Sequence, residues 1–121
     1  MTDTDSSPEP QFDVRTTATG CVQVLAVRGE LDELTAPQLA EAITDSLSES
    51  PAALVVDFSE LDFLASAGMT VLLEGHHAAG SSTRFAVVAD GPSTSRPIKM
   101  MGLDNVFSLY PTLGAALADI R

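Results

Sequence analysis

The sequence predicts a single α/β domain with a small, mixed, mostly parallel β-sheet and about four helices. Three observations lead to this prediction. The chain has 121 residues, which suits one domain, and 45% of them are apolar, enough to bury a small core. Short β-branched and aliphatic runs alternate with segments of helical periodicity, the pattern of parallel strands joined by helices. Aromatic residues supply only 5% of the chain, so we expect an aliphatic core.

The predicted fold opens with a hairpin. Met1 to Gln11 is rich in Ser, Thr, Asp, Glu and Pro, a composition that favours a disordered tail, so the domain is expected over residues 12–121. Residues 12–17 form a short strand candidate, and Thr19-Gly20 is the expected turn. Residues 21–28 are almost continuously apolar, which indicates a strand buried on both faces.

A helix, a strand and a second helix follow. Apolar residues recur at helical spacing over residues 34–47, and Pro51 closes that helix. Residues 53–58 are β-branched and aliphatic, as in a buried strand. We expect residues 59–65 to form a loop, followed by a helix that contains Met69.

The last third of the chain continues the alternation. Gly80 ends the second helix, and residues 83–89 form another aliphatic strand. A short third helix is expected between Arg96 and Met101, and residues 105–109 are a candidate edge strand. A final helix starts at Pro111-Thr112, and its expected buried stripe consists of Leu113, Ala116, Leu117 and Ile120.

The charge of the chain limits its partners. Six Lys and Arg stand against 17 Asp and Glu, giving a net charge of -11, which would repel nucleic acid and anionic membranes. The acidity serves either solubility or the steering of basic protein surfaces. Cys21 is the only cysteine, and the N-terminus lacks the basic and apolar regions of a signal peptide. We therefore expect a cytoplasmic protein that binds neither nucleic acid nor membrane.

The most informative stretch runs from Leu54 to Met69, a buried strand followed by polar residues and a helix start. Ser66 is predicted to cap this helix by accepting a hydrogen bond from a backbone N–H, the commonest role of a serine there. A phosphate on Ser66 would also be favoured by the helix N-terminus. Gly68 is expected to let another chain or a ligand approach the first turn closely.

Three segments make the chain similar to anti-sigma factor antagonists of the STAS family. The family's regulatory loop ends in Asp-Ser-Ser/Thr-Gly, and here Ser66 and Gly68 occupy the positions of the regulatory serine and the glycine. The other segments are Gly29-Glu30-Leu31-Asp32 with Thr35-Ala36, and Met101-Gly102-Leu103-Asp104-Asn105-Val106-Phe107. The resemblance covers the chain from about Phe12 to its end and implies the STAS fold.

The resemblance implies a partner-switching regulator. Such proteins bind an anti-sigma factor, which then releases its sigma factor, and in one branch the anti-sigma factor is itself a serine kinase that phosphorylates the antagonist. Ser66 would be the phosphorylated residue. The expected partner-binding residues are Glu30, Asp32, Thr35, Ala65, Ala67, Gly68 and Met69. A monomer is expected when the protein is free.

Two departures from the family pattern keep an alternative open. Ala65 stands where phosphorylated members usually have Asp, and Ala67 where a second hydroxyl residue is common. The alternative is a scaffold or sensor STAS domain that binds a small molecule or a protein assembly and is indifferent to Ser66.

An enzyme is not expected. The sequence offers no nucleophile–base pair and no phosphate-binding loop, so we predict no catalytic residue and no cofactor. His76 and His77 are adjacent, so they point in different directions on a helix, and no third ligand has a suitable spacing. We therefore predict no metal site.

Overall fold

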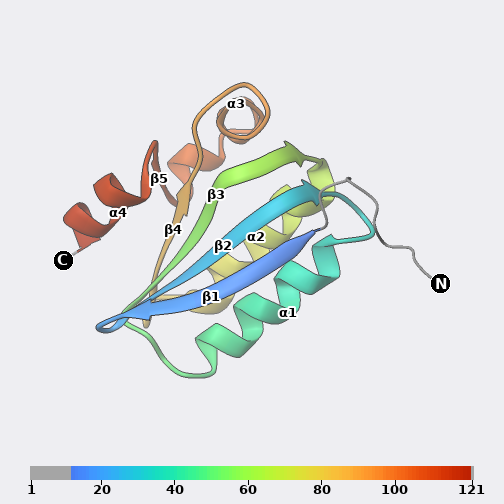
Figure 1. The fold of residues 1–121 in the computed structure, drawn as a ribbon. Coiled ribbons are helices and arrows are strands. Elements are labelled where there is room, and N and C mark those ends of the chain that lie inside the picture. Colours follow the sequence, from blue (N-terminus) through green and yellow to red (C-terminus); the bar gives the residue numbers. More distant parts are fainter. Residues whose placement is uncertain (1–11, 121) are drawn as a thin grey trace.

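A computed structural model describes residues 12–120, and the predicted disordered tail, residues 1–11, lies outside this range. Strands and helices alternate after an opening hairpin (Figure 1). The elements are β1 (Asp13–Thr19), β2 (Val22–Leu31), α1 (Ala36–Leu47), β3 (Ala53–Leu64), α2 (Ser66–Ala79), β4 (Arg84–Val88), α3 (Ser95–Met100), the 3-10 turn η1 (Leu103–Asn105), β5 (Ser108–Tyr110) and α4 (Leu113–Ile120).

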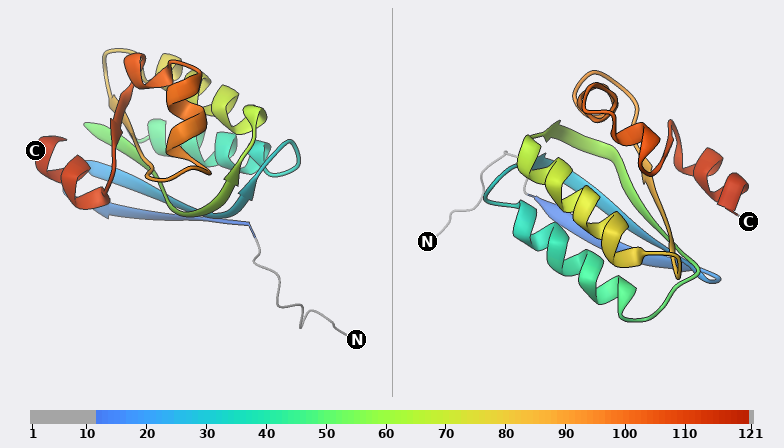
Figure 2. Two further views of the ribbon diagram at one scale, coloured as in Figure 1. Left: turned by 90° about the horizontal axis from the view of Figure 1, so that it is seen from above. Right: turned by 180° about the vertical axis from the view of Figure 1, so that it is seen from behind.

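The five strands lie in the sheet in the order in which they follow along the chain, β1-β2-β3-β4-β5. β1 is antiparallel to β2, and every later neighbouring pair is parallel, which confirms the mixed, mostly parallel sheet. Parallel crossovers are almost always right-handed, so successive helices fall on the same face of such a sheet. α1 and α2 lie side by side on one face, whereas α4 lies on the other (Figure 2).

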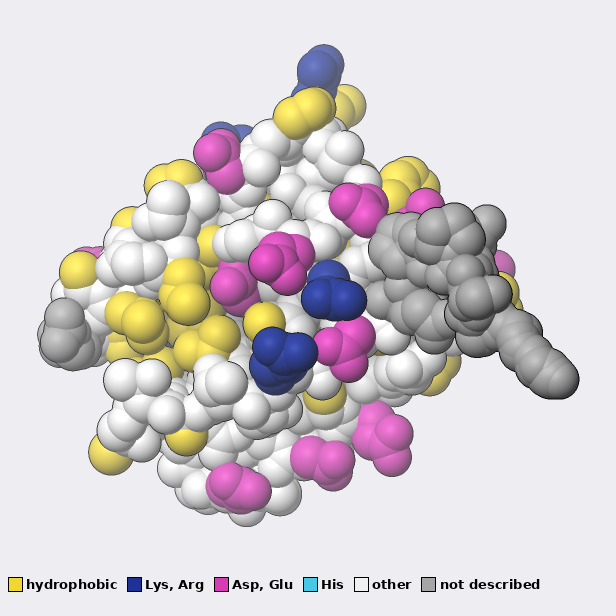
Figure 3. Space-filling model, viewed as in Figure 1, with side chains coloured by type: hydrophobic (Ala, Val, Ile, Leu, Met, Phe, Trp, Pro, Cys, Tyr) yellow, Lys and Arg dark blue, Asp and Glu magenta, His cyan; other side chains and the backbone are white. Residues whose placement is uncertain are grey.

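The core has one layer on each side of the sheet, because successive residues of a strand point to opposite faces. On the side of α1 and α2, Leu25, Val27, Leu54 and Val56 pack with the helices. The opposite layer is smaller and is covered by Ala116 of α4; its strand residues are Val22, Val24, Ala53, Val55, Ala86 and Val88. The sheet side that α4 leaves open carries charged side chains of both signs (Figure 3).

β3 is longer than the sequence indicated. The loop predicted over residues 59–65 was wrong, because the strand continues to Leu64 and pairs with β2, which runs to Leu31. β4 pairs with β3 only as far as Asp57, so one edge of the later part of β3 is free of β4. Polar residues are tolerated in a strand with a solvated side. Leu61 and Leu64 are still buried, and they hold this part of β3 on the core.

The hairpin turn is displaced by one residue from its predicted place. Thr19 is the last residue of β1, and Gly20 and Cys21 form the turn. Gly20 has a φ of 62°, a conformation that glycine adopts without steric cost. Cys21 is exposed and belongs to the turn, not to the strand in which it was predicted.

α4 is attached to the sheet by a polar cluster as well as by Ala116. The carboxylate of Asp119 accepts hydrogen bonds from the Tyr110 hydroxyl and from the Arg84 guanidinium, the latter at 3.2 Å. The hydrogen bond from Tyr110 is the main reason that the pKa of Asp119 lies below its ordinary value, and Arg84 lowers it further. None of the helices formed by the described residues combines the length and apolar character that a membrane crossing requires.

Candidate functional site

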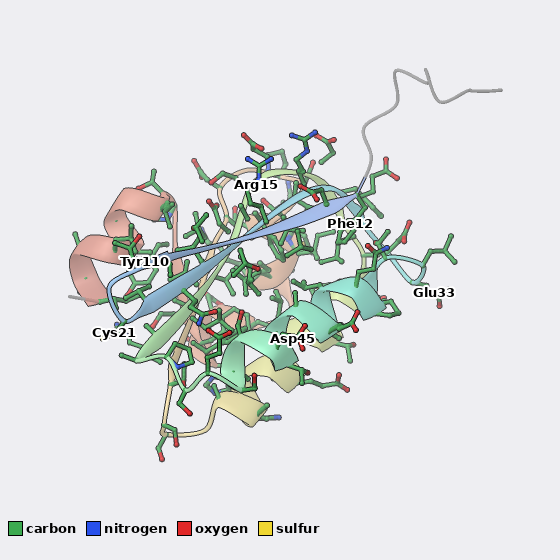
Figure 4. All side chains as sticks on the ribbon, turned by 60° about the horizontal axis from the view of Figure 1, so that its bottom comes forward. Phe12, Arg15, Cys21, Glu33, Asp45 and Tyr110 are labelled. Carbon is green, nitrogen blue, oxygen red and sulfur yellow. The ribbon has the colours of Figure 1, made fainter. Side chains whose placement is uncertain are left out.

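The predicted site residues come together at the carboxyl ends of β2 and β3. The chain leaves these two parallel neighbours at the same edge of the sheet, and loops at this edge commonly form binding sites. The N–H of Ala65 donates to the carbonyl of Leu31 at 2.9 Å, and this bond ties the residue after β3 to the last residue of β2. Figure 4 shows Glu33 at this end of the molecule and Cys21 at the opposite end.

An open hollow of about 580 Å³ lies between the two chain segments. It is lined from the β2–α1 loop and from the first turns of α2, by Asp32, Glu33, Leu34, Ala65, Ser66, Ala67 and Thr70. The structure thus brings the predicted residues Asp32, Ala65, Ser66 and Ala67 to one surface. Glu30 is exposed at the end of β2, where it pairs with Phe63 of β3.

The β2–α1 loop is held by bonds within itself. The Asp32 carboxylate oxygen Oδ1 accepts from the backbone N–H of Leu34 at 3.0 Å and of Thr35 at 3.2 Å. The Thr35 hydroxyl donates to the carbonyl of Glu30 at 2.8 Å and accepts from the N–H of Asp32 at 2.9 Å. Asp32 and Thr35 therefore shape the loop. Asp32 also lines the hollow, and the partner contact expected of both residues stays a prediction.

Ser66 does not cap α2, so that prediction was wrong. Because β3 runs to Leu64, the residue before the helix is Ala65, with φ -91° and ψ 170°, and it has no side chain to accept a hydrogen bond. Ser66 is the first helical residue and is exposed. Within residues 12–120 its hydroxyl has no hydrogen-bond partner, whereas its carbonyl accepts from the Thr70 hydroxyl at 3.2 Å. The Ser66 hydroxyl is therefore not used by the described fold.

Gly68 serves internal packing, and the approach of another chain or a ligand expected at this position stays a prediction. It is buried, and a Cβ placed on it would lie 2.6 Å from Leu31 Cδ2 and 2.7 Å from Leu64 Cδ1. The absence of a side chain lets the first turn of α2 rest directly on the ends of β2 and β3. Met69 is half-buried and packs against the same core. Both residues thus pack the first turn of α2, which begins at Ser66, onto the core, and their expected contact with a partner stays a prediction.

The charges around the hollow have one sign. Asp32 and Glu33 line it, and no Lys or Arg of the described residues does. The first turn of α2 carries no acidic residue, so its backbone N–H groups keep their partial positive charge. The surface combines an acidic loop with a helix N-terminus that favours an anion.

Other groups considered from the sequence lie elsewhere. No group of three or more His, Cys, Asp and Glu side chains in residues 12–120 is placed to hold a metal ion. His76 lies beside Phe85 and Phe107, with ring centroids 6.3 Å away in each case, so it packs against aromatic rings.

Leu34 was missed as a site residue. It was expected to begin the first helix, but α1 starts at Ala36 and Leu34 is 85% exposed in the loop. A signal was present in the sequence, because Asp32 and Thr35 at a spacing of three are typical of a turn closed by side-chain hydrogen bonds.

Comparison with known proteins decides the family. Residues 13–116 match the STAS domain. The chain belongs to the STAS domain family. This STAS domain is 45% identical over 100 residues to the anti-sigma-F factor antagonist RsfB of Mycobacterium tuberculosis, covering 83% of this chain and 82% of RsfB. The resemblance read from the three sequence segments is thereby confirmed.

Solved structures have the same fold. The crystal structure of an anti-sigma factor antagonist from Mycobacterium paratuberculosis superposes with a TM-score of 0.89 at 43% identity, covering 96% of this STAS domain and 98% of that chain. An anti-sigma-factor antagonist (STAS) domain protein from Planctomyces limnophilus gives a TM-score of 0.77 at 19% identity, covering 88% and 97% of the two chains. The predicted fold class is confirmed.

Proposed function

We propose that this protein is an anti-sigma factor antagonist that binds an anti-sigma factor through the surface around Ser66 and is released when Ser66 is phosphorylated. The named mycobacterial relatives support the antagonist role, because they match nearly the whole domain at 45% and 43% identity. One observation carries the regulatory part. Ser66 is exposed and lines the hollow, and its hydroxyl takes part in no hydrogen bond within residues 12–120.

A phosphate at this position would change binding without opposing the fold. It adds about -1.5 to -2 charges at pH 7, and the N-terminus of α2 favours an anion. In a complex the same group would be desolvated against the partner, at a cost of several kcal/mol if it found no cation there. Each loss of about 1.4 kcal/mol weakens binding tenfold. Phosphorylation would thus lower affinity by orders of magnitude.

The partner would catalyse the phosphorylation. An anti-sigma factor with serine kinase activity would move the terminal phosphoryl group of ATP to the Ser66 oxygen. The hydroxyl proton would pass to a base of the kinase, and ADP would leave. In this scheme the antagonist is a regulator and a substrate, acts in the cytoplasm, and is a monomer before it binds. Its formal charge of -11 favours a protein partner over nucleic acid.

Calorimetry with each purified anti-sigma factor of the source genome tests the proposal. At least one should bind the wild type more tightly than about 10 µM, which corresponds to roughly 7 kcal/mol. Ser66→Ala should bind like the wild type, whereas Ser66→Asp should bind at least tenfold more weakly because its carboxylate is desolvated. Ser81→Asp is the matched control, since Ser81 is exposed in the turn after α2, away from the hollow.

Phosphorylation itself is measured by mass spectrometry. Incubation with the partner, ATP and Mg²⁺ should add one phosphate to the wild type and none to Ser66→Ala. If no anti-sigma factor binds, the antagonist role is wrong.

A second candidate is a phosphorylation-independent scaffold or sensor domain, favoured by Ala65 in place of the family's Asp. Binding of Ser66→Asp at wild-type strength, with no phosphate added, would establish that alternative.

A further inference from the structure

Leu34 is the most exposed of the large apolar side chains among the described residues. It is 85% exposed, compared with 75% for Met100 and 49% for Phe63. Single exposed apolar residues are common on protein surfaces, so exposure alone assigns no role. The position of Leu34 is what distinguishes it, because it lines the same hollow as Ser66.

The backbone holds Leu34 in this exposed position. Its N–H donates to Asp32 Oδ1, and the neighbouring Thr35 is tied at both its N–H and its hydroxyl. α1 begins immediately afterwards, with the N–H of Ala36 donating to the carbonyl of Asp32 at 2.8 Å. A side chain presented on a fixed turn loses little backbone entropy when a partner covers it.

The charges beside Leu34 indicate the surface that would cover it. Asp32 precedes it in the hollow and Glu33 is exposed next to it, with no basic residue among the described lining residues. Glu33 lies on the outer loop at this end of the molecule (Figure 4). A partner that buries Leu34 therefore faces carboxylates, and basic side chains around its apolar recess would complement them.

We infer that Leu34 is the apolar anchor of the interface with the anti-sigma factor, and that the partner presents an apolar recess bordered by Lys or Arg on the side that faces Glu33, whereas the part of the partner that faces Ser66 offers no cation to a phosphate. This inference rests on the function proposed above and adds the residue that contributes affinity, in contrast to Ser66, which switches it. In this assignment the Leu34 side chain is buried by the partner, whereas the charge of Glu33 speeds the association of the two proteins.

The test uses the anti-sigma factor that binds the wild type most tightly in calorimetry. Leu34→Ala should weaken binding at least tenfold. The thermal midpoint should stay within about 3 °C, because the side chain is exposed in the free protein. Met100→Ala is the matched control, an exposed apolar side chain on α3 outside the hollow, and should change affinity less than twofold. Glu33→Gln should lower the association rate and flatten its dependence on salt.

The outcomes separate this inference from the function on which it rests. A wild type that binds and responds to Ser66→Asp, with Leu34→Ala at wild-type affinity, would refute the anchor and leave the antagonist role standing. Equal losses from Leu34→Ala and Met100→Ala would also refute it, because the effect would not be specific to the hollow. If the wild type binds no anti-sigma factor, both the anchor role of Leu34 and the antagonist role are refuted.

Discussion

Replacing Ala65 by Asp should stabilise the fold. Ala65 has the extended backbone of a residue that precedes a helix, and α2 begins directly after it. No side chain of residues 12–120 accepts a hydrogen bond from the first N–H groups of this helix. An Asp side chain at this position can accept one of those hydrogen bonds. The substitution therefore supplies a cap that Ala65 does not provide.

The expected gain is about 1 kcal/mol. Exchanging Ala for Asp or Asn at the residue before a helix is worth about 0.5–2 kcal/mol. A negative charge at the helix start adds about 0.3–1 kcal/mol, but here the carboxylates of Asp32 and Glu33 line the same hollow and oppose it. The two charge effects roughly offset each other, which leaves the hydrogen bond as the main contribution.

Urea unfolding followed by circular dichroism measures this gain. With a slope of about 2 kcal/mol per molar urea, the midpoint should rise by about 0.5 M. Ala65→Asn separates the two effects, since it caps without a charge. Ala67→Asn is the control, because Ala67 lies inside the helix, beyond the capping position. If neither Ala65 variant is more stable than the wild type, the assignment of Ala65 as an uncapped helix start is refuted.

Two further predictions follow from packing and from charge. Gly68→Ala should destabilise the fold by about 1–3 kcal/mol, because its Cβ would overlap two buried leucine side chains. The control Gly114→Ala, at an exposed position of α4, should be neutral or stabilising by up to about 1 kcal/mol. Equal urea midpoints for the two variants would contradict this prediction. The pKa of Asp119 lies below its ordinary value in the folded state because of Tyr110 and Arg84. The contribution of Asp119 to stability is therefore present above the unfolded-state pKa of about 4, and it is lost as the pH falls through the folded-state pKa. The stability difference between the wild type and Asp119→Asn should therefore narrow below about pH 4, and a difference that stays constant from pH 7 to pH 3 would count against the cluster.

The fold could be predicted from the sequence because its signals are local. Helical spacing, aliphatic runs and Gly80 at the end of α2 each depend on residues close together in the chain. The length of β3 could not be predicted in the same way. Ser59 and Glu60 resemble a loop by composition, and they form a strand because the distant β2 extends beside them.

The sequence predicted which residues lie together at this end of the sheet but not their contacts. Ser66 was predicted to cap the helix, and the structure places it one position later, as the first helical residue. The packing role of Gly68 depends on Leu31, which lies far away in sequence, so no local pattern reveals it. The exposure of Leu34 depends on where α1 begins, and helix boundaries are the least certain part of a periodicity argument.

The hydrogen bonds that build the site have a consequence for how quickly a signal could be reversed. The β2–α1 loop is closed by Asp32 and Thr35, and it is joined to α2 through the N–H of Ala65. None of these bonds uses the Ser66 side chain. A phosphate could be added or removed there without breaking them, so no refolding step would separate the two states. Loss of the phosphate would then restore the binding form without a conformational delay.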